Sequence, residues 1–301
     1  MLRPGQPDSE ALFRGLNCGL TLTTGPFRFR VQSPLRTVHR GLQRLYTGFP
    51  IEPDNGFRDF HVDLRPVLGP RRWLRPLVNF HVDGHAPFKP LPAAQAFAML
   101  EWGMNWCIAA NAHHYLLLHA AVLERSGRAV ILPGDPGAGK STLTAALMLS
   151  GWRLLSDEIT MIDRDDGLVV PLARPVGLKN RSIEIIRAFD PQAVIGDIAQ
   201  DTHKGTVAHL RPSAESVARM AEKAAAAHVV FPRWQEGAEA SLRPRAKADA
   251  FMHNATHAFN YSLLGRLGFD LNVALIDACD CWDFEYSRLD DALRIFEDLA
   301  R

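Results

Sequence analysis

Eight consecutive residues carry the clearest chemical signal in this chain, and they read Gly134-Asp135-Pro136-Gly137-Ala138-Gly139-Lys140-Ser141. The spacing Gly-x4-Gly-Lys-Ser is that of a phosphate-binding loop, whose glycines let successive N–H groups point at phosphate oxygens. Lys140 would reach the β- and γ-phosphates, and the hydroxyl of Ser141 would hold Mg²⁺. The sequence therefore predicts that ATP and Mg²⁺ bind along this loop and the next residue, Thr142.

Two adjacent acids form the second feature. Asp157 and Glu158 follow the apolar pair Leu154-Leu155 at the end of a predicted strand. In α/β sheets the carboxyl ends of the strands line the ligand crevice. A carboxylate there can ligate Mg²⁺ or accept the proton of an attacking hydroxyl, whereas the alternative is an acidic turn that faces solvent. We favour the functional interpretation for this pair.

Other titratable residues are open to two interpretations. His119 interrupts an apolar run, where a histidine is usually part of the core, but its nearness in sequence to the loop also allows a contact with the site. Asp163, Asp165 and Asp166 lie beside Gly167 in a predicted hairpin turn, and we interpret them as facing solvent.

Two cationic segments, residues 179–181 and residues 204–211, have the charge to clamp a transferring phosphoryl group. The same residues could equally be solvated faces, and the sequence leaves both interpretations open. Gly205 lies inside the second segment and indicates a mobile stretch.

The elements that would position these residues follow from hydrophobic periodicity and from Gly and Pro. Strands are predicted at 26–31, 60–63, 80–83, 129–132, 152–155 and 228–232. The tetrapeptide Phe-His-Val-Asp occurs at both Phe60 and Phe80 and predicts two strands of a meander. Helices are predicted at 91–111, 141–150, 213–227, 248–267 and 289–299, the second of them capped by Gly151. Residues 115–123 form one apolar run, and residues 174–182 and 201–212 are predicted loops.

Composition is typical of a globular chain of one large or two ordinary domains. The 301 residues are 47% hydrophobic and 22% charged, with a net charge of +1 that argues against a nucleic-acid-binding protein. The four cysteines have no CxxC pair, which indicates reduced thiols. The first ten residues lack the apolar core of a secretory signal, and the most apolar stretch, residues 104–123, contains asparagines and histidines. We therefore expect a cytoplasmic protein with no membrane partner.

Together these features resemble the catalytic core of bacterial HPr kinase/phosphorylase, from His119 to about Ile162. The match consists of His119-Ala120, the apolar strand, the glycine-rich loop and the segment that ends in Asp157-Glu158. The chain resembles the HprK-related kinase A group over more of its length, from about Gly25 onward, at residues 101–106, 118–122, 174–180 and 204–210.

The resemblance implies a chemistry. HPr kinases transfer phosphate from ATP or pyrophosphate to a serine hydroxyl of a small protein, and they can reverse the transfer with inorganic phosphate. By position, Glu158 would take the serine proton, Asp157 would support it, and His119 would be the catalytic histidine. Lys140 and Ser141 would be the lysine and serine of the phosphate-binding loop.

Two departures from the family limit what can be carried over. The family has Asp-Asp where this chain has Asp157-Glu158, and a misplacement near 1 Å can cost ~10²-fold in rate. The family's Glu-x-Arg-Gly element has no counterpart, and residues 174–181 stand in its place. The reverse reaction and the acceptor therefore stay open. Related kinases are encoded beside peptide-modification genes, which makes a peptide an acceptor to consider.

The resulting expectation is an α/β fold with an HPr kinase-like (PEP carboxykinase-like) P-loop core at 112–301. A β-rich N-terminal region with a connecting helix is expected at 1–111. The expected function is ATP-dependent transfer of the γ-phosphoryl group to a hydroxyl, preferably serine, on a protein or peptide. In this reading Ser141 and Asp157 hold Mg²⁺. The alternatives are a nucleotide-gated interaction module or weak ATPase, and a small-molecule kinase. Relatives form rings, so a homo-oligomer is compatible with the resemblance.

Overall fold

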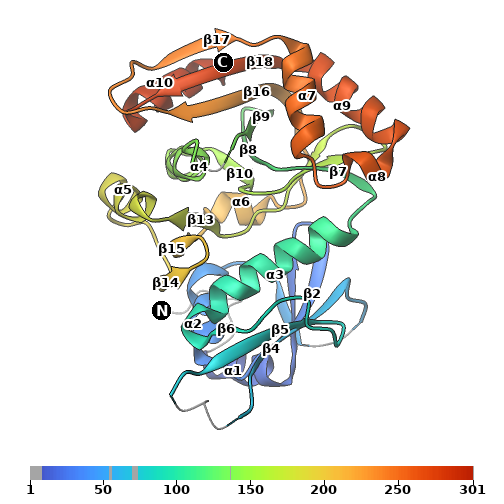
Figure 1. Cartoon of the computed structure of the whole chain (residues 1–301), viewed down its shortest axis with the longest axis vertical. Helices are drawn as coiled ribbons and strands as arrows, with labels where there is room; N and C mark the ends of the chain where they lie inside the picture. Colours follow the sequence, from blue (N-terminus) through green and yellow to red (C-terminus); the bar gives the residue numbers. More distant parts are fainter. Residues whose placement is uncertain (1–8, 54–55, 70–73, 136, 301) are drawn as a thin grey trace.

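A computed structural model of the chain describes residues 9–53, 56–69, 74–135 and 137–300. These residues form a mixed α/β fold that contains two six-stranded and two three-stranded sheets. Figure 1 shows one six-stranded sheet in the lower half of the molecule and the other in the upper half. The long helix α3 (Ala96–Asn111) lies between them. A short 3-10 helix, η2 (Ala93–Gln95), leads into it.

The lower sheet has the strand order β3-β1-β2-β4-β5-β6. Its strands are β1 (Leu20–Thr24), β2 (Phe27–Gln32), β3 (Ile51–Pro53), β4 (Phe60–Pro66), β5 (Leu77–Val82) and β6 (Leu91–Pro92). β4 and β5 pair antiparallel, which confirms the repeated tetrapeptide as neighbouring strands. Two helices that the sequence patterns did not predict, α1 (Ser9–Cys18) and α2 (Arg36–Leu45), contribute Leu12, Leu16, Val38 and Leu42 to the core of this half.

The upper sheet has the order β10-β8-β9-β16-β18-β17. Its strands are β8 (Ala120–Arg125), β9 (Arg128–Pro133), β10 (Arg153–Ser156), β16 (Ala225–Trp234), β17 (Ser241–Pro244) and β18 (Asp280–Tyr286). β9, β16 and β18 are parallel. β8 is antiparallel to both β9 and β10, so β10 runs in the direction of β9. The carboxyl ends of these four strands therefore lie at one edge of the sheet.

The elements nearest the glycine-rich loop match their predictions closely. The predicted strands at 129–132 and 152–155 are β9 and β10, and the predicted helix between them is α4 (Lys140–Leu149). Gly151 has φ +92°, as expected for a residue that ends a helix in the left-handed region. The last predicted helix is α10 (Leu289–Leu299). The sequence thus located the strand, loop and helix on which the candidate site depends.

The remaining strands form two small sheets with the orders β12-β11-β7 and β13-β15-β14. They are β7 (Tyr115–Leu118), β11 (Thr160–Asp163), β12 (Val169–Val170), β13 (Val176–Lys179), β14 (Ala199–Thr202) and β15 (Gly205–Leu210). The apolar run at 115–123 is therefore two strands of different sheets, and His119 is the residue between them. β11 and β12 form the hairpin that was predicted around Gly167.

The predictions of loops at 174–182 and 201–212 were wrong. β13 and β15 pair antiparallel through these segments, and α5 (Arg181–Phe189) begins directly after β13. Gly205 follows a tight turn between β14 and β15 with φ +81°, where a glycine is favoured for its backbone geometry. β15 ends in a run of buried residues, Val207 to Leu210, and β13 buries Val176 and Leu178. The polar and charged residues around these short runs made both segments resemble loops.

The predicted helix at 213–227 was also wrong. Only α6 (Ala214–Ala218) is helical, and the alanine run passes into β16. Alanine has the highest helix propensity, but propensity is a weak signal that pairing with neighbouring strands overrides. β16 lies between β9 and β18 and pairs with both, so its position in the sheet decides its conformation.

The predicted helix at 248–267 is three helices, α7 (Lys247–His257), α8 (Tyr261–Leu264) and α9 (Arg266–Ala278). The first break is explained by Asn260, whose side chain accepts a hydrogen bond from the Leu117 N–H and donates one to the Tyr115 carbonyl. Gly265, with φ +55°, separates the other two helices. Contacts with β7 therefore end a helix that local periodicity alone would continue.

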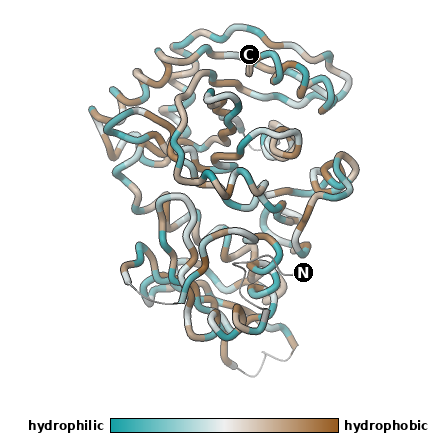
Figure 2. Tube along the Cα trace, turned by 180° about the vertical axis from the view of Figure 1, so that it is seen from behind, coloured by the Kyte–Doolittle hydropathy of each residue, from teal (hydrophilic) through white to brown (hydrophobic). Residues whose placement is uncertain are grey.

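Polar and apolar residues are interleaved along the trace in Figure 2. Among the described residues, no helix combines the length and the hydropathy that crossing a bilayer would require.

Candidate active site

The glycine-rich loop connects the carboxyl end of β9 to the first turn of α4. Gly137 and Gly139 have φ values of +93° and +87°, so both adopt the left-handed conformation that glycine accommodates without strain. A Cβ atom at Gly139 would lie 2.6 Å from the Tyr286 hydroxyl and 2.9 Å from Trp234 Cβ. The loop is therefore packed too closely against the ends of β16 and β18 for any larger residue.

Two hydrogen bonds hold the loop in this position. The Trp234 N–H donates to the Ala138 carbonyl at 3.0 Å, and the Tyr286 hydroxyl donates to the Gly139 carbonyl at 3.2 Å. Within the loop, the Ala138 N–H donates to the Asp135 carbonyl at 3.1 Å, which tightens the turn. A phosphate cradle would use the other N–H groups of the loop and of the first turn of α4. Asp135 lies 3.4 Å from the imidazole of His257 on α7, and Pro136 lies outside the described residues.

Lys140 is the first residue of α4, and its Nζ lies 3.5 Å from the Gly134 carbonyl. Burial lowers the pKa of Lys140, while the nearby carboxylates Asp157 and Glu158 oppose that shift. The ammonium is thus placed between its own loop and the acidic pair. A cation in this position can interact with charge that develops between the loop and the acids.

Asp157 follows β10 directly and is held by the backbone of β13. Its Oδ2 accepts a hydrogen bond from the Gly177 N–H at 2.9 Å, whereas its buried Oδ1 has no hydrogen-bond partner in the protein. Burial raises the pKa of Asp157 to about 6, although the bond from Gly177 opposes the shift. A buried carboxylate oxygen without a partner is costly, so this atom fits a site for a cation.

Glu158 points into the same space but is more open, with 34% of its side chain exposed. Its Oε2 accepts a hydrogen bond from Asn105 Nδ2 at 2.6 Å, and its Oε1 lies 3.8 Å from Lys204 Nζ. Burial acts to raise the pKa of Glu158, but the surrounding cations, led by Lys204 and Lys179, hold it below its usual value. Glu158 is therefore ionised at neutral pH and can accept a proton.

His119, between β7 and β8, lines the same cavity as the acidic pair. Burial lowers its pKa to about 4, with Lys140 adding to the shift, so the imidazole is neutral at pH 7. Its ring meets Phe259 edge-on at 5.5 Å, and its buried Nδ1 has no hydrogen-bond partner in the protein. Of the two interpretations that the sequence left open, the structure places this histidine beside the candidate site.

All these elements surround one cavity of about 1350 Å³. The residues predicted from sequence that line it are His119, Asp135, Gly137, Gly139, Lys140, Ser141, Thr142, Asp157 and Glu158. Gly134 and Ala138 belong to the loop but are not among the lining residues. Asp163 and Asp166 lie in the β11–β12 hairpin, where both pair with Lys223, and they have no part in the cavity.

The two cationic segments converge on this cavity from β13 and from the β14–β15 hairpin. Lys179, Arg181 and Lys204 all line it, whereas Arg211 does not. Lys204 Nζ also lies over the ring of Trp102, 5.3 Å from its centroid, so the lysine is held by an aromatic face and by Glu158. Lysines in this arrangement surround the space in front of the acidic pair with positive charge.

The residues that sequence reasoning missed come from α3 and from the segment before β13. Trp102, Asn105 and Arg174 line the cavity, and none of them was among the site residues predicted from sequence. One available signal was the pair Glu101 and Asn105, which are polar, four residues apart, and therefore on one face of an otherwise apolar helix. What that face would contact could not be inferred from the sequence.

The donors present fit Mg²⁺ bound together with phosphate oxygens. Within the described ranges, no three His, Cys, Asp or Glu side chains gather into a cluster that could hold a metal by itself. Mg²⁺ uses few protein ligands, commonly one or two carboxylates or hydroxyls, with phosphates and waters completing its shell. The free Oδ1 of Asp157 and the hydroxyl of Ser141, which line the same cavity, are such a set.

No protein-family model and no curated protein matches this chain. Among solved structures, the HPr(Ser) kinase/phosphatase of Coxiella burnetii is similar at a TM-score of 0.27 and 12% sequence identity. The alignment covers 61% of this chain and 96% of that chain. A similarity this distant assigns no residue of the site, whose interpretation therefore depends on its own geometry.

Proposed function

We propose that this protein is an ATP-dependent phosphotransferase that moves the γ-phosphoryl group to a hydroxyl of a protein or peptide, with serine as the expected acceptor. The observation that carries the proposal is a single arrangement. A glycine-rich loop with the Gly-Lys-Ser ending opens onto the same cavity as Asp157, whose buried Oδ1 has no protein partner, and Glu158, which is ionised.

In the proposed reaction the backbone of the loop binds the phosphates of ATP, and Lys140 lies beside the charge that develops on them. The acceptor hydroxyl oxygen forms a bond to the γ-phosphorus. The bond from that phosphorus to the β–γ bridging oxygen breaks, which releases ADP. The hydroxyl proton passes to Glu158. Ser141 and Asp157 would hold Mg²⁺, which neutralises phosphate charge when it is bound.

Glu158 is a better candidate than Asp157 for the proton acceptor. Asp157 has the pKa closer to neutrality, but its Oδ2 is engaged by the Gly177 N–H and its Oδ1 is buried. Glu158 is one-third exposed, so an acceptor hydroxyl can approach it. Access decides the assignment, because a general base must come within hydrogen-bond distance of the proton that it removes.

The Lys140→Met variant tests the proposal. It removes the ammonium next to the acids while keeping a side chain of similar length. We expect transfer of label from γ-labelled ATP to serine-bearing peptides or proteins to fall by ~10²–10³-fold. The circular dichroism spectrum should be unchanged, and the melting temperature should stay near that of the wild type. Transfer by the variant at the wild-type rate would refute the proposal.

A nucleotide-gated interaction module is the second candidate. It is favoured by the pairing of Glu158 with Lys204, because a carboxylate whose pKa is held low is a weak base. Such a module would bind ATP and change shape with no transfer. Glu158→Gln separates the two functions, since it leaves the phosphate loop untouched. Loss of transfer with retained ATP affinity identifies the phosphotransferase.

A further inference from the structure

A chain of short polar contacts runs from the candidate site into the core of the lower half of the molecule. It starts at Glu158, whose Oε2 accepts from Asn105 Nδ2 at 2.6 Å. Asn105 Oδ1 accepts from Arg174 Nη1 at 2.6 Å. Arg174 Nη2 donates to Glu101 Oε2, also at 2.6 Å, and the Tyr46 hydroxyl donates to Glu101 Oε1 at 2.6 Å. We refer to these five residues as the Arg174 chain.

The far end of the Arg174 chain is fixed. Tyr46, Glu101 and Arg174 are 2%, 3% and 5% exposed. Arg174 also donates to the Glu101 backbone carbonyl at 3.0 Å, so its guanidinium is bonded at several points. Burial and the neighbouring Glu101 raise the pKa of Tyr46 well above its usual value, so its hydroxyl keeps the proton that it donates. Buried, fully paired groups of this kind have little freedom to move.

Asn105 lies between two side chains with opposite hydrogen-bonding requirements. A guanidinium can only donate hydrogen bonds, and an ionised carboxylate can only accept them. A side chain between Arg174 and Glu158 must therefore accept on one side and donate on the other, which a carboxamide does with its oxygen and its NH₂. Leucine has nearly the same shape and neither function. Aspartate has the same shape and can accept from Arg174 but cannot donate while ionised.

We propose that Asn105 is a positioning residue, which holds the carboxylate of Glu158 in place for proton transfer. Helix α3 thereby contributes a residue on which catalysis depends. This inference rests on the proposed phosphotransferase function for its kinetic consequence and on the Arg174 chain for its geometry. A carboxylate on a surface turn samples several rotamers, whereas one bonded to a partly buried amide that Arg174 anchors is confined near one.

The experiment compares Asn105→Asp with Asn105→Leu at pH 8 and at pH 9, because the neighbouring Glu158 raises the pKa of a new carboxylate and only its ionised form lacks a donor. Asn105→Asp keeps an acceptor for Arg174 and removes the donor to Glu158. Asn105→Leu removes both. Asn111→Leu, at the exposed end of the same helix, is the matched control. The readouts are kcat and KM for ATP in the transfer assay, the melting temperature, and a crystal structure of Asn105→Asp.

We expect Asn105→Asp to lower kcat by ~10²-fold, the typical cost of a catalytic group displaced by about 1 Å. KM for ATP should change by less than about twofold, because the nucleotide contacts are elsewhere. Its melting temperature should stay close to that of the wild type, and Glu158 should occupy a different rotamer in its crystal structure. Asn105→Leu should lower both kcat and the melting temperature, and Asn111→Leu should change neither.

A purely structural role for Asn105 predicts that activity follows stability, so that Asn105→Asp keeps the wild-type kcat. That result, or an unmoved Glu158 in its crystal structure, would overturn the inference. The crystal structure needs no acceptor. If the wild type transfers no phosphate but Glu158 is displaced in Asn105→Asp, the proposed function fails while the positioning of Glu158 by Asn105 stands.

Discussion

Two arginine–glutamate pairs in this fold have nearly the same chemistry and very different surroundings. Arg153 Nε lies 2.5 Å from Glu124 Oε2, and both side chains are 3% exposed. Arg174 Nη2 lies 2.6 Å from Glu101 Oε2, and these side chains are 6% and 4% exposed. In distance and burial the pairs are almost equivalent, so neither property indicates what each pair does.

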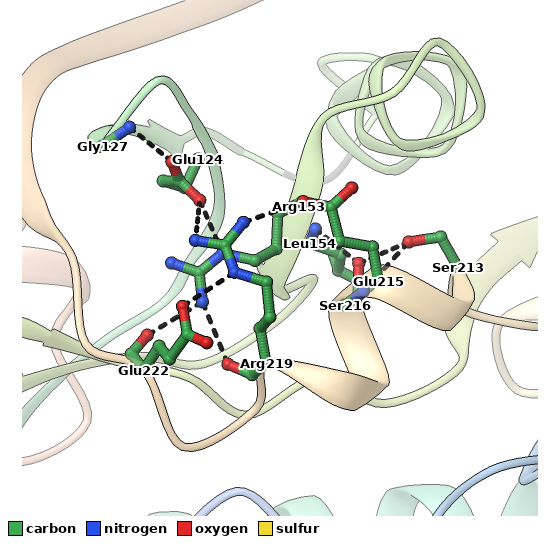
Figure 3. Close-up of polar contacts among 9 residues, drawn as sticks. All are labelled: Glu124, Gly127, Arg153, Leu154, Ser213, Glu215, Ser216, Arg219 and Glu222. Carbon is green, nitrogen blue, oxygen red and sulfur yellow. Dashed lines mark hydrogen bonds and ion pairs between the residues drawn. The ribbon is translucent and has the colours of Figure 1, made fainter.

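The surroundings of Arg153 form a closed cluster, drawn in Figure 3. Arg153 Nη1 donates to the backbone carbonyls of Arg219 and Glu222, and Glu124 Oε1 accepts from the Gly127 N–H. None of these residues lines the cavity. This Arg153 cluster (Glu124, Gly127, Arg153, Arg219 and Glu222) ties the start of β10 to the turn after β8 and to the segment after α6. Its role is therefore to hold backbone segments together.

The Arg174 chain, in contrast, ends on a side chain of the candidate site. A buried ion pair is weak evidence for stability, because the loss of hydration can offset the attraction between the charges. The comparison shows that the other hydrogen bonds of each arginine are more informative than its ion pair. In the Arg153 cluster they end on backbone carbonyls. In the Arg174 chain they lead to Asn105 and then to Glu158.

Replacing each arginine should have the largest effects on stability and on transfer activity. Arg153→Met and Arg174→Met each remove the closest arginine from a buried glutamate, so each should lower the free energy of unfolding by about 3–5 kcal/mol. Arg219 Nη2 remains 3.6 Å from Glu124 Oε2, which places Arg153→Met at the lower end of that range. Transfer activity should separate them. Per folded molecule, Arg153→Met should keep the wild-type kcat, and Arg174→Met should lose ~10²-fold through the displaced Glu158. Urea unfolding measures the first quantity, and the labelled-ATP assay measures the second.

Equal loss of activity in the two variants would contradict the different roles assigned to the two pairs, because activity would then depend on stability alone. The assay is run at a temperature at which both variants are folded by circular dichroism, and ATP affinity is measured alongside as a check on the phosphate loop.

A smaller effect on the free energy of unfolding is expected from pH. Its sign differs between Asp157 in the candidate site and Glu124 in the Arg153 cluster. Burial raises the pKa of Asp157 from 3.8 to about 6, so its charge destabilises the folded state progressively as pH rises through that range. Burial also acts to raise the pKa of Glu124, but the hydrogen bonds from Arg153 and Gly127 hold it below its usual value. Glu124 therefore contributes stability at neutral pH, and that contribution is lost as pH falls through its folded-state pKa.

Asp157→Asn should accordingly raise the free energy of unfolding by up to about 3 kcal/mol at pH 8 and leave it unchanged below about pH 4. Glu124→Gln should lower it at pH 8, with the loss shrinking in acid. Thermal unfolding of the wild type and both variants from pH 4 to pH 8 measures these differences. If the Asp157→Asn variant is less stable than the wild type at pH 8, the interpretation that the buried charge of Asp157 destabilises the folded protein is contradicted.

The sequence predicted the part of the site that is local along the chain. The glycine-rich loop, the helix after it and the acids after β10 all depend on spacing within about 25 residues, and glycines and apolar runs mark that spacing directly. His119 is an intermediate case. Its position between two strands was recognisable as an interruption, but the cavity that it faces was not.

The parts that could not be predicted depend on contacts between distant segments. Asn105 and Arg174 meet because α3 contacts β15, the strand that pairs with β13 directly after Arg174, and no local pattern encodes that contact. The alanine run of residues 224–227 was predicted as helix for the same reason, since its partners, Val169 and strand β9, are about 50 to 100 residues away in sequence. Local periodicity therefore gives elements, and long-range packing decides which side chains share a site.

The most direct test of the account is transfer of label from γ-labelled ATP to a panel of serine-bearing peptides and proteins, with the wild type and Glu158→Gln side by side. The account predicts label on an acceptor hydroxyl with the wild type and at least ~10²-fold less with the variant, while both proteins bind ATP with the same affinity. Equal labelling by the two proteins would contradict it, because Glu158 would then have no part in the chemistry.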